Sequence, residues 1–538
     1  MRSVLLALAV LAPLAQDPST RFVPSGQDPN PIDAAMESLW KEQGISPATL
    51  CDDADFLRRI TLDLVGTIPT ADEARAFIES KDADKRTKKI DALIASDAFL
   101  DFWSSRLAAA LIGFPRDYEY NVNRGGFQKW IRERLADGAG WDAIAQELIT
   151  AGGTIKDKPE TSFIAQFLDF NERGLRLKVE ELTGKASSVF LGVRIRCAQC
   201  HDHPHDRWTQ EDFFGMVAYF QKTDGSGDYN AIGVKTQKKP VKRKFEGWKG
   251  ELVPKFIGLG APESENLRLE FAEQLTKHDQ FARAFVNRVW ACFFGRGIVN
   301  PYDDFAPQFK PVAPAALDGL ATRFRESKHD LKWLIRTVAT SKTYQRSSRA
   351  TNGQDAALQE KLFARSRVRP LTPDQLWNAI ERATNLSKAD VDLKAIRRMV
   401  GTDPAAMAQS GREMLKRWFF TLMARTSNPD APAALGTYTA NVQMILRALS
   451  VDSPLWSGVR PLGGGTLDDL LLYDDQPESV IAKLYLSAVG RRPTEAEVRR
   501  CMNHVERRKE ELTKNGKERG LEEVFWALIN TDEFIFNH

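Results

Sequence analysis

Apolar side chains recur every three or four residues along most of the chain, which predicts a protein built from amphipathic helices. Within 53–64, for example, Phe56, Ile60 and Leu64 stand at this spacing among charged residues. None of the helical runs contains the long alternation of apolar and polar residues that is typical of strands. The other runs cover 84–96, 98–113, 125–136, 141–150, 270–294, 314–326, 329–341, 372–385, 405–424, 438–449 and 476–538.

Polar residues mark the start of several of these helices. Thr70 and Glu73 have the spacing of a capping box, which predicts a helix over 71–80. Pro493-Thr494-Glu495 is a second helix start, and Thr209 is positioned to cap a third helix.

Residues 223–262 interrupt the helical pattern with seven glycines and a basic cluster from Lys235 to Lys244. We interpret them as a loop-rich insertion with a little β structure, including a short strand within 251–257. The basic cluster is typical of a solvated loop, and binding of a sulfated or acidic glycan is the alternative. The predicted fold is all-α and multi-helical, with two large helical domains (31–222 and 263–538) on either side of this insertion.

The first 15 residues have the pattern of a signal peptide. Arg2 supplies the positive charge, Val4 to Leu14 form a short apolar run, and Ala15 precedes the expected cleavage site. An uncleaved N-terminal anchor is the alternative. The pattern predicts export to the periplasm or the extracellular space, with 16–30 as a flexible leader. No later run is apolar enough for an integral membrane segment.

The charges of the 538-residue chain nearly cancel, since 75 Lys and Arg stand against 72 Asp and Glu for a net charge of +3. This balance provides no general attraction to nucleic acid, so we expect no nucleic-acid partner.

The sharpest chemical motif is Cys197-Ala-Gln-Cys200-His201. Cys-x-x-Cys-His is the attachment pattern of haem c. Two thiols at this spacing form thioethers with one porphyrin, and the adjacent imidazole becomes an axial ligand of the iron. The sequence therefore predicts haem c at Cys197, Cys200 and His201. Met216 is the favoured sixth ligand, His278 and His329 are more distant candidates, and a five-coordinate haem is the alternative.

The same segment is also compatible with a non-haem metal. Two thiolates and two imidazoles would form a tetrahedral Zn²⁺ site, which Asp202 and Asp206 would support from outside. A disulfide between the two cysteines is a third interpretation. Cys51, Cys292 and Cys501 have apolar surroundings typical of buried small hydrophobic residues. The candidate metal ligands are Cys197, Cys200, His201, His203 and His205.

Other polar pairs are weaker candidates for a functional site. His278-Asp279 and His329-Asp330 are interpreted as helix starts, and Asp303-Asp304 as a solvated or capping pair in a loop. Asn287-Arg288 is interpreted as a structural polar anchor.

Long segments of the chain resemble a planctomycete paired-domain family of unknown function, in which a cytochrome-C-type domain precedes a second planctomycete-enriched domain. The resemblance covers most of residues 31–538, although Ala313 stands where relatives often have His. The matching segments are 58–69, 190–204 with Trp208, Gln210 and 212–215, 281–290, 294–299, 303–305, 331–336, 341–344, 525–530 and 533–534.

Together, motif and resemblance imply an exported haem c protein in electron transfer or oxidoreduction, with a redox partner protein. The alternative is a zinc-stabilised binding or scaffold protein that works beside polysaccharide-degrading enzymes, a setting implied by the resemblance alone. A hydrolase that uses a zinc-bound water is the third hypothesis.

Overall fold

The computed structural model describes residues 30–113, 120–171, 174–228, 231–387, 411–424, 464–512 and 514–538. The predicted signal peptide, the leader up to residue 29 and the predicted helix over 438–449 lie outside these ranges, as does the start of 405–424. Helices dominate and the strands are short, which confirms the predicted all-α, multi-helical class. In the described ranges, no helix is both long enough and apolar enough to cross a membrane.

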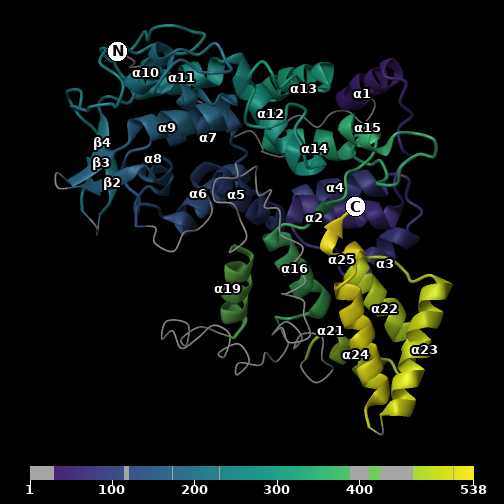
Figure 1. Cartoon of the computed structure of the whole chain (residues 1–538). Helices are drawn as coiled ribbons and strands as arrows, with labels where there is room; N and C mark the ends of the chain where they lie inside the picture. The colour runs from purple at the N-terminus through teal and green to yellow at the C-terminus, as the bar shows by residue number, and fades with distance from the viewer. Residues whose placement is uncertain are drawn as a thin grey trace, which may run out of the picture.

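The first part of the chain is helical up to the glycine-rich insertion (Figure 1). The capping box predicted at Thr70 is present and begins α3, and the cap predicted at Thr209 begins α10, where Asp212 completes a capping box as well. The helices are α1 (Pro31–Glu42), α2 (Asp53–Val65), α3 (Ala71–Glu79), α4 (Lys85–Ile94), α5 (Asp97–Ile112), α6 (Arg124–Ala136), α7 (Trp141–Thr150), α8 (Ser162–Ala165), α9 (Val179–Ala186) and α10 (Gln210–Ala218), with shorter turns η2 (Pro159–Thr161), η3 (Ser187–Leu191) and η4 (Ile195–Ala198).

The insertion contributes strands to a small antiparallel sheet of order β1-β5-β4. Its strand β5 lies in the middle and pairs with β4 on one side and with β1 of the preceding helical segment on the other, so the insertion is joined to that segment by backbone hydrogen bonds. The predicted strand within 251–257 is wrong. That stretch has no neighbouring strand with which to pair. It is held in place instead by the burial of Phe256 and Ile257 in the hydrophobic core. The strands are β1 (Gly153–Thr154), β4 (Thr223–Ser226) and β5 (Gly233–Thr236), with the separate hairpin β2 (Leu168–Asn171) and β3 (Gly174–Leu177).

Helices resume after the insertion, as predicted. The run over 270–294 is split at His278, because the His278 side chain accepts a hydrogen bond from the backbone N–H of Gln280 and caps a new helix. The elements are α11 (Leu267–Lys277), α12 (Asp279–Phe294), α13 (Pro314–Glu326), α14 (Leu331–Thr340), α15 (Ala356–Lys361), β6 (Arg369–Pro370), α16 (Pro373–Thr384), α19 (Gly411–Ala424), α21 (Thr466–Tyr473), α22 (Pro477–Val489), α23 (Glu495–Glu511), α24 (Gly516–Ile529), α25 (Asp532–Ile535) and β7 (Phe536–Asn537).

One large hydrophobic core, here called the main core, extends from α1 to the residues just after α15. Helix α12 is buried along most of its length within it. Trp141 of α7 stacks on Phe285 of α12 with ring centroids 4.2 Å apart, and Trp103 of α5 stacks on Phe293 at 6.0 Å. Helices from before and after the insertion therefore share the main core.

A second, smaller core, here called the C-terminal core, lies among α16, α19 and α21 to α25. These helices form the lower part of Figure 1, where the last ones are coloured towards yellow. Helix α2 contacts both cores: Ile60 and Leu64 belong to the main core, whereas Leu62 belongs to the C-terminal core. This helix therefore joins the two packed bodies.

A buried carboxylate on α2 connects segments that are far apart in sequence. Asp63 is 1% exposed, and both of its oxygens accept hydrogen bonds from Arg369 at 2.6 Å. Tyr344 Oη donates to Asp63 at 2.8 Å and Asn537 Nδ2 donates at 3.0 Å. Burial and the neighbouring Asp63 raise the pKa of Tyr344, so its hydroxyl stays protonated and donates. The carboxylate thus has a full set of partners, as a buried charge requires.

The adjacent arginines of α2 hold the C-terminal end of the chain. Arg58 donates to the main-chain oxygens of Ala488 and Phe534, at 3.1 and 2.7 Å. Arg59 donates to the main-chain oxygens of Tyr344 and His538, at 2.7 and 2.5 Å. The Arg58–Pro69 segment is therefore a joint between the two cores.

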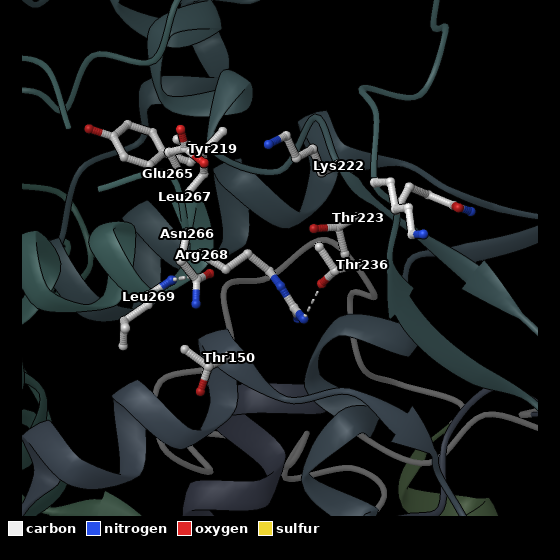
Figure 2. Close-up of a pocket in the computed structure, with 12 residues that line it drawn as sticks. Thr150, Tyr219, Lys222, Thr223, Thr236, Glu265, Asn266, Leu267, Arg268 and Leu269 are labelled. Atoms are coloured by element: carbon white, nitrogen blue, oxygen red, sulfur yellow. Dashed lines mark hydrogen bonds between the residues drawn. The ribbon is translucent and has the colours of Figure 1, made fainter. Parts of the chain in front are cut away.

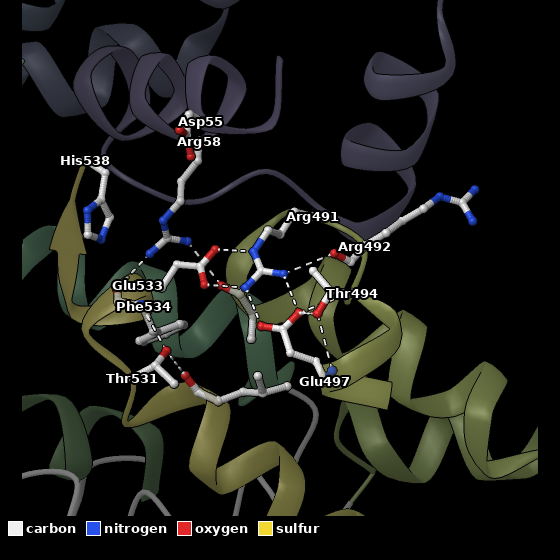
Figure 3. Close-up of polar contacts among 12 residues, drawn as sticks. Asp55, Arg58, Arg491, Arg492, Thr494, Glu497, Thr531, Glu533, Phe534 and His538 are labelled. Atoms are coloured by element: carbon white, nitrogen blue, oxygen red, sulfur yellow. Dashed lines mark hydrogen bonds and ion pairs between the residues drawn. The ribbon is translucent and has the colours of Figure 1, made fainter. Parts of the chain in front are cut away.

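A cluster of ion pairs lies beside this joint, at the edge of the C-terminal core (Figure 3). Arg491 donates to Glu497 at 2.8 and 2.9 Å and to Glu533 at 2.6 and 2.8 Å. Glu497 also closes the capping box of α23 through Thr494, which confirms the helix start predicted at Pro493-Thr494-Glu495. The hydrogen bonds from Arg491 lower the pKa of Glu497 to about 2.

This depressed pKa predicts an acid-labile contribution to stability. Because Glu497 has an ordinary pKa of 4.5 and a folded pKa of about 2, its contribution is full above pH 4.5 and is lost as the pH falls towards 2. We expect Glu497→Gln to lower the free energy of unfolding at pH 7 by about 1–2 kcal/mol. Denaturant titrations followed by circular dichroism across this pH range should show a smaller difference between variant and wild type at pH 2.5. A constant difference would contradict the assignment.

Candidate functional site

The Cys-x-x-Cys-His segment forms a surface turn between η3 and α10. Within η4, Ile195 and Ala198 are both 0% exposed and anchor the turn in the main core. Cys197, Cys200 and His201 are all exposed, and neither thiol forms a disulfide. The local fold therefore buries Ala198, between the two cysteines, and leaves the two thiols and the imidazole accessible.

Helix α10 fixes the position of this turn. The backbone N–H of Gln210 donates to the Asp202 carboxylate at 2.9 Å, and the Gln210 side chain donates to the main-chain oxygen of Gln199 at 2.9 Å. The same side-chain amide lies 3.4 Å from the main-chain oxygen of Gly247 in the insertion. Gln210 therefore ties the motif to two neighbouring segments. No local pattern in the sequence indicates this role, because the Gln210 side chain bonds to main-chain oxygens.

Two histidines of the segment are held in opposite tautomers. Nδ1 of His201 lies 2.7 Å from the main-chain oxygen of Asp202. Because a carbonyl oxygen only accepts, Nδ1 carries the proton and the Nε2 lone pair is free to ligate. Nδ1 of His203 instead accepts a hydrogen bond from the backbone N–H of His205 at 3.2 Å, so the proton of a neutral His203 ring lies on Nε2. Only His201 has the tautomer of an Nε2 ligand.

The remaining members of the predicted Cys/His metal set lie on the same turn. In the described residues, no group of three or more His, Cys, Asp or Glu side chains is gathered closely enough to hold a metal ion. Asp202 and Asp206, which were predicted to support the imidazoles, accept hydrogen bonds from the backbone N–H groups of Gln210 and Arg207 in the structure. The support of His201 comes from a main-chain oxygen instead.

The three side chains considered as a sixth haem ligand are engaged elsewhere. Met216 of α10 is 0% exposed in the main core. His278 caps α12. His329 packs edge-on against Phe281 and Phe324, with ring centroids 5.4 and 5.1 Å away. The helix starts predicted at His278-Asp279 and His329-Asp330 are confirmed, because His278 caps α12 and Asp330 caps α14.

The chain leading into the motif is held by residues from beyond the insertion. Arg194, three residues before Cys197, pairs with Asp303 at 2.8 Å. Asp303 and Asp304 are 7% and 9% exposed, so the predicted solvation is wrong, whereas the predicted capping holds for Asp304, which accepts from the backbone N–H of Ala306 at 3.1 Å. Gly192 has φ 64° and its main-chain oxygen accepts from Phe305 N–H at 2.8 Å. A Cβ on Gly192 would lie 2.5 Å from the Phe305 ring, so this close approach requires glycine.

The predicted polar anchor at Asn287-Arg288 is confirmed. The Asn287 amide donates to the main-chain oxygens of Val299 and Tyr302, at 2.9 and 3.1 Å, and accepts from Val299 N–H at 3.0 Å. Arg288 lies over the Tyr302 ring, with its guanidinium carbon 5.0 Å from the centroid. These contacts fix the loop that presents Asp303 to Arg194.

Residues 31–225 match the family PSCyt2, described as a protein of unknown function (DUF1549). Residues 267–505 match the family PSD1, described as a protein of unknown function (DUF1553). The chain belongs to the planctomycete paired-domain family. No curated protein and no solved structure matches it.

The two matched domains of this planctomycete paired-domain protein are physically interdependent. The PSCyt2 segment contains the Cys-x-x-Cys-His turn, whereas Asp303 and Phe305, which hold the approach to that turn, belong to the PSD1 segment. Ala313 is buried and precedes α13 without a side-chain cap. In this member of the family, the second domain therefore supports the turn through the Asp303 loop.

Proposed function

We propose that the protein is an exported c-type haem protein that serves in electron transfer or oxidoreduction. Cys197 and Cys200 would attach the haem through thioether bonds, and His201 would provide the axial imidazole. The single observation that carries this proposal is the hydrogen bond from His201 Nδ1 to the main-chain oxygen of Asp202, which leaves Nε2 as the free ligand atom.

The accessibility of the turn supports the fit of this group. Both thiols are exposed and unbonded, so each can form a bond to carbon without first breaking a disulfide. Ala198 is buried between them, and the ties from Gln210 to Asp202 and Gln199 hold the turn against α10. A bound haem would supply reversible one-electron redox chemistry. The chain's own residues would anchor it and set the orientation of its axial imidazole.

The burial of Met216 bears on the coordination number. Drawing this side chain out of α10 would open a cavity in the main core, at a cost of about 2–5 kcal/mol for a large buried side chain. Because His278 and His329 are also engaged, the proposal favours His201 as the one axial ligand from among these residues.

Covalent attachment is tested by exporting the whole chain in a host with active cytochrome c maturation. We expect a haem-staining band on a denaturing gel and a c-type absorption spectrum. Replacing both thiols, as Cys197→Ala with Cys200→Ala, should abolish the stain, because no thioether remains. The matched control is Cys501→Ala, which removes a half-buried thiol outside the motif and should leave the stain intact.

Metal analysis of the same preparations separates the alternatives. A folded wild-type protein without haem stain would overturn the proposal. Stoichiometric zinc in that protein, lost in the double cysteine variant, would instead favour the zinc-stabilised binding or scaffold function. Cosecretion with a redox partner or with polysaccharide-degrading enzymes is a subsequent question for whichever cofactor is found.

A further inference from the structure

A pocket of about 550 Å³ lies beside the start of α11, on elements that the proposed haem turn does not use. It is formed where the end of α7, the β4 and β5 strands and the start of α11 meet (Figure 2). Its volume is within the range of about 300–1,000 Å³ that is typical of small-molecule sites. The lining residues are Thr150, Tyr219, Lys222, Thr223, Thr236, Gln237, Lys238, Glu265, Asn266, Leu267, Arg268 and Leu269.

The pocket contains an arginine without an acidic partner. Arg268 donates to the main-chain oxygens of Ala151 and Ile149, at 2.5 and 3.5 Å, and to the Thr236 hydroxyl at 2.9 Å, and among the described residues no carboxylate pairs with it. Burial alone lowers the pKa of Arg268, to about 10. Arg268 is partly exposed, and a cation that is partly withdrawn from water is stabilised by an opposite charge beside it. The missing counter-charge is the first observation that points to an anionic ligand.

A second, independent observation is an unused hydroxyl group. Thr223 is 1% exposed, and its Oγ1 has no hydrogen-bond partner in the protein. In Figure 2 this hydroxyl lies on the side of the pocket that also holds the Thr236 hydroxyl and the Arg268 guanidinium. Because a buried hydroxyl is costly to leave unbonded, this atom is a donor that a ligand can satisfy.

The charges of the lining residues favour an anion. Lys222, Lys238 and Arg268 are positive, and Glu265 is the one negative residue in the lining. Guanidinium, ammonium and hydroxyl donors together suit a tetrahedral oxyanion, which accepts several charge-assisted hydrogen bonds at once.

We propose that this pocket binds a ligand through a sulfate or phosphate monoester group, with Arg268, Lys222 and the Thr223 hydroxyl as the donors. The pocket is larger than a bare oxyanion, so the ester carries a further polar group such as a sugar ring. This binding is separate from the proposed haem chemistry and does not depend on it.

The proposal is tested by isothermal titration calorimetry on the full chain at constant ionic strength. The probes are glucose 6-sulfate, glucose 6-phosphate and unsubstituted glucose. We expect at least one charged ester to bind and glucose not to bind, and the preferred ester identifies the source of the oxyanion. Thr223→Val should weaken binding about tenfold, since it removes one hydrogen bond to a charged group. Lys222→Gln should weaken it about threefold.

Thr223→Val keeps the shape of the side chain and breaks no hydrogen bond of that hydroxyl within the protein, so the variant is expected to fold. The matched control is Lys239→Gln, which removes a neighbouring exposed charge outside the pocket lining. Absence of binding by both esters to the folded wild type would overturn the proposal. Unchanged binding in Thr223→Val would also overturn it, because the hydroxyl would then not be a donor. An equal loss in Lys222→Gln and Lys239→Gln would overturn it as well, because it would assign the effect to general charge attraction.

Discussion

Replacing Asp63 with alanine is expected to lower the free energy of unfolding by about 3–5 kcal/mol. The change removes the acceptor for Arg369, Tyr344 and Asn537 together. It leaves the Arg369 guanidinium, 16% exposed, without its counter-charge. Because Asp63 lies on α2, which contributes side chains to both cores, we expect the packing between the main core and the C-terminal core to weaken. Equilibrium denaturation measured by tryptophan fluorescence and circular dichroism gives the free energy.

The variant Asp63→Asn separates the two contributions, because it keeps one acceptor oxygen and removes the charge. We expect a loss between those of Asp63→Ala and wild type. The control is Asp97→Ala, which breaks an exposed ion pair with Arg132 and should cost less than about 1 kcal/mol. If Asp63→Ala were no more destabilising than Asp97→Ala, the buried network would not be the joint inferred from its contacts.

Replacing His201 with alanine is expected to abolish imidazole ligation of the haem, whereas His203→Ala should preserve it. The expectation follows from the tautomers: Nε2 of His201 is free to ligate, but a neutral His203 has its proton on Nε2. Haem would remain attached to the two thiols in both variants. The absorption spectrum should therefore lose its imidazole-ligated form in His201→Ala alone. Added imidazole should restore that form, which a merely misfolded variant would not do.

The same pair of variants distinguishes haem from zinc. A Cys₂His₂ zinc site built from Cys197, Cys200, His201 and His203 would lose metal in either histidine variant. The His203–His205 hydrogen bond is at the surface, so its loss should cost no more than about 1 kcal/mol in stability. An identical spectroscopic change in both variants would contradict the tautomer argument.

Local sequence signals predicted local structure well. Helices begin at Thr70, Thr209 and Thr494 as expected. Each start is a capping box, which depends on two residues three positions apart. The strand predicted within 251–257 failed because strand formation requires a partner, and none lies alongside. The break at His278 was indicated by the His278-Asp279 pair and not by the apolar periodicity over 270–294, which continues across it.

The sequence by itself determined the helices, their capping residues and the Cys-x-x-Cys-His motif, because each depends on residues a few positions apart. Tertiary structure alone decided which polar groups are buried together. Asp63 and Asn537 are 474 positions apart, and no local pattern relates them. The pocket at Thr223 and Arg268 likewise arises only where β4, β5 and α11 pack. The physical reason is that the energetic and chemical role of a charge or hydroxyl depends on its burial and on its hydrogen-bond partners, and both are set by packing.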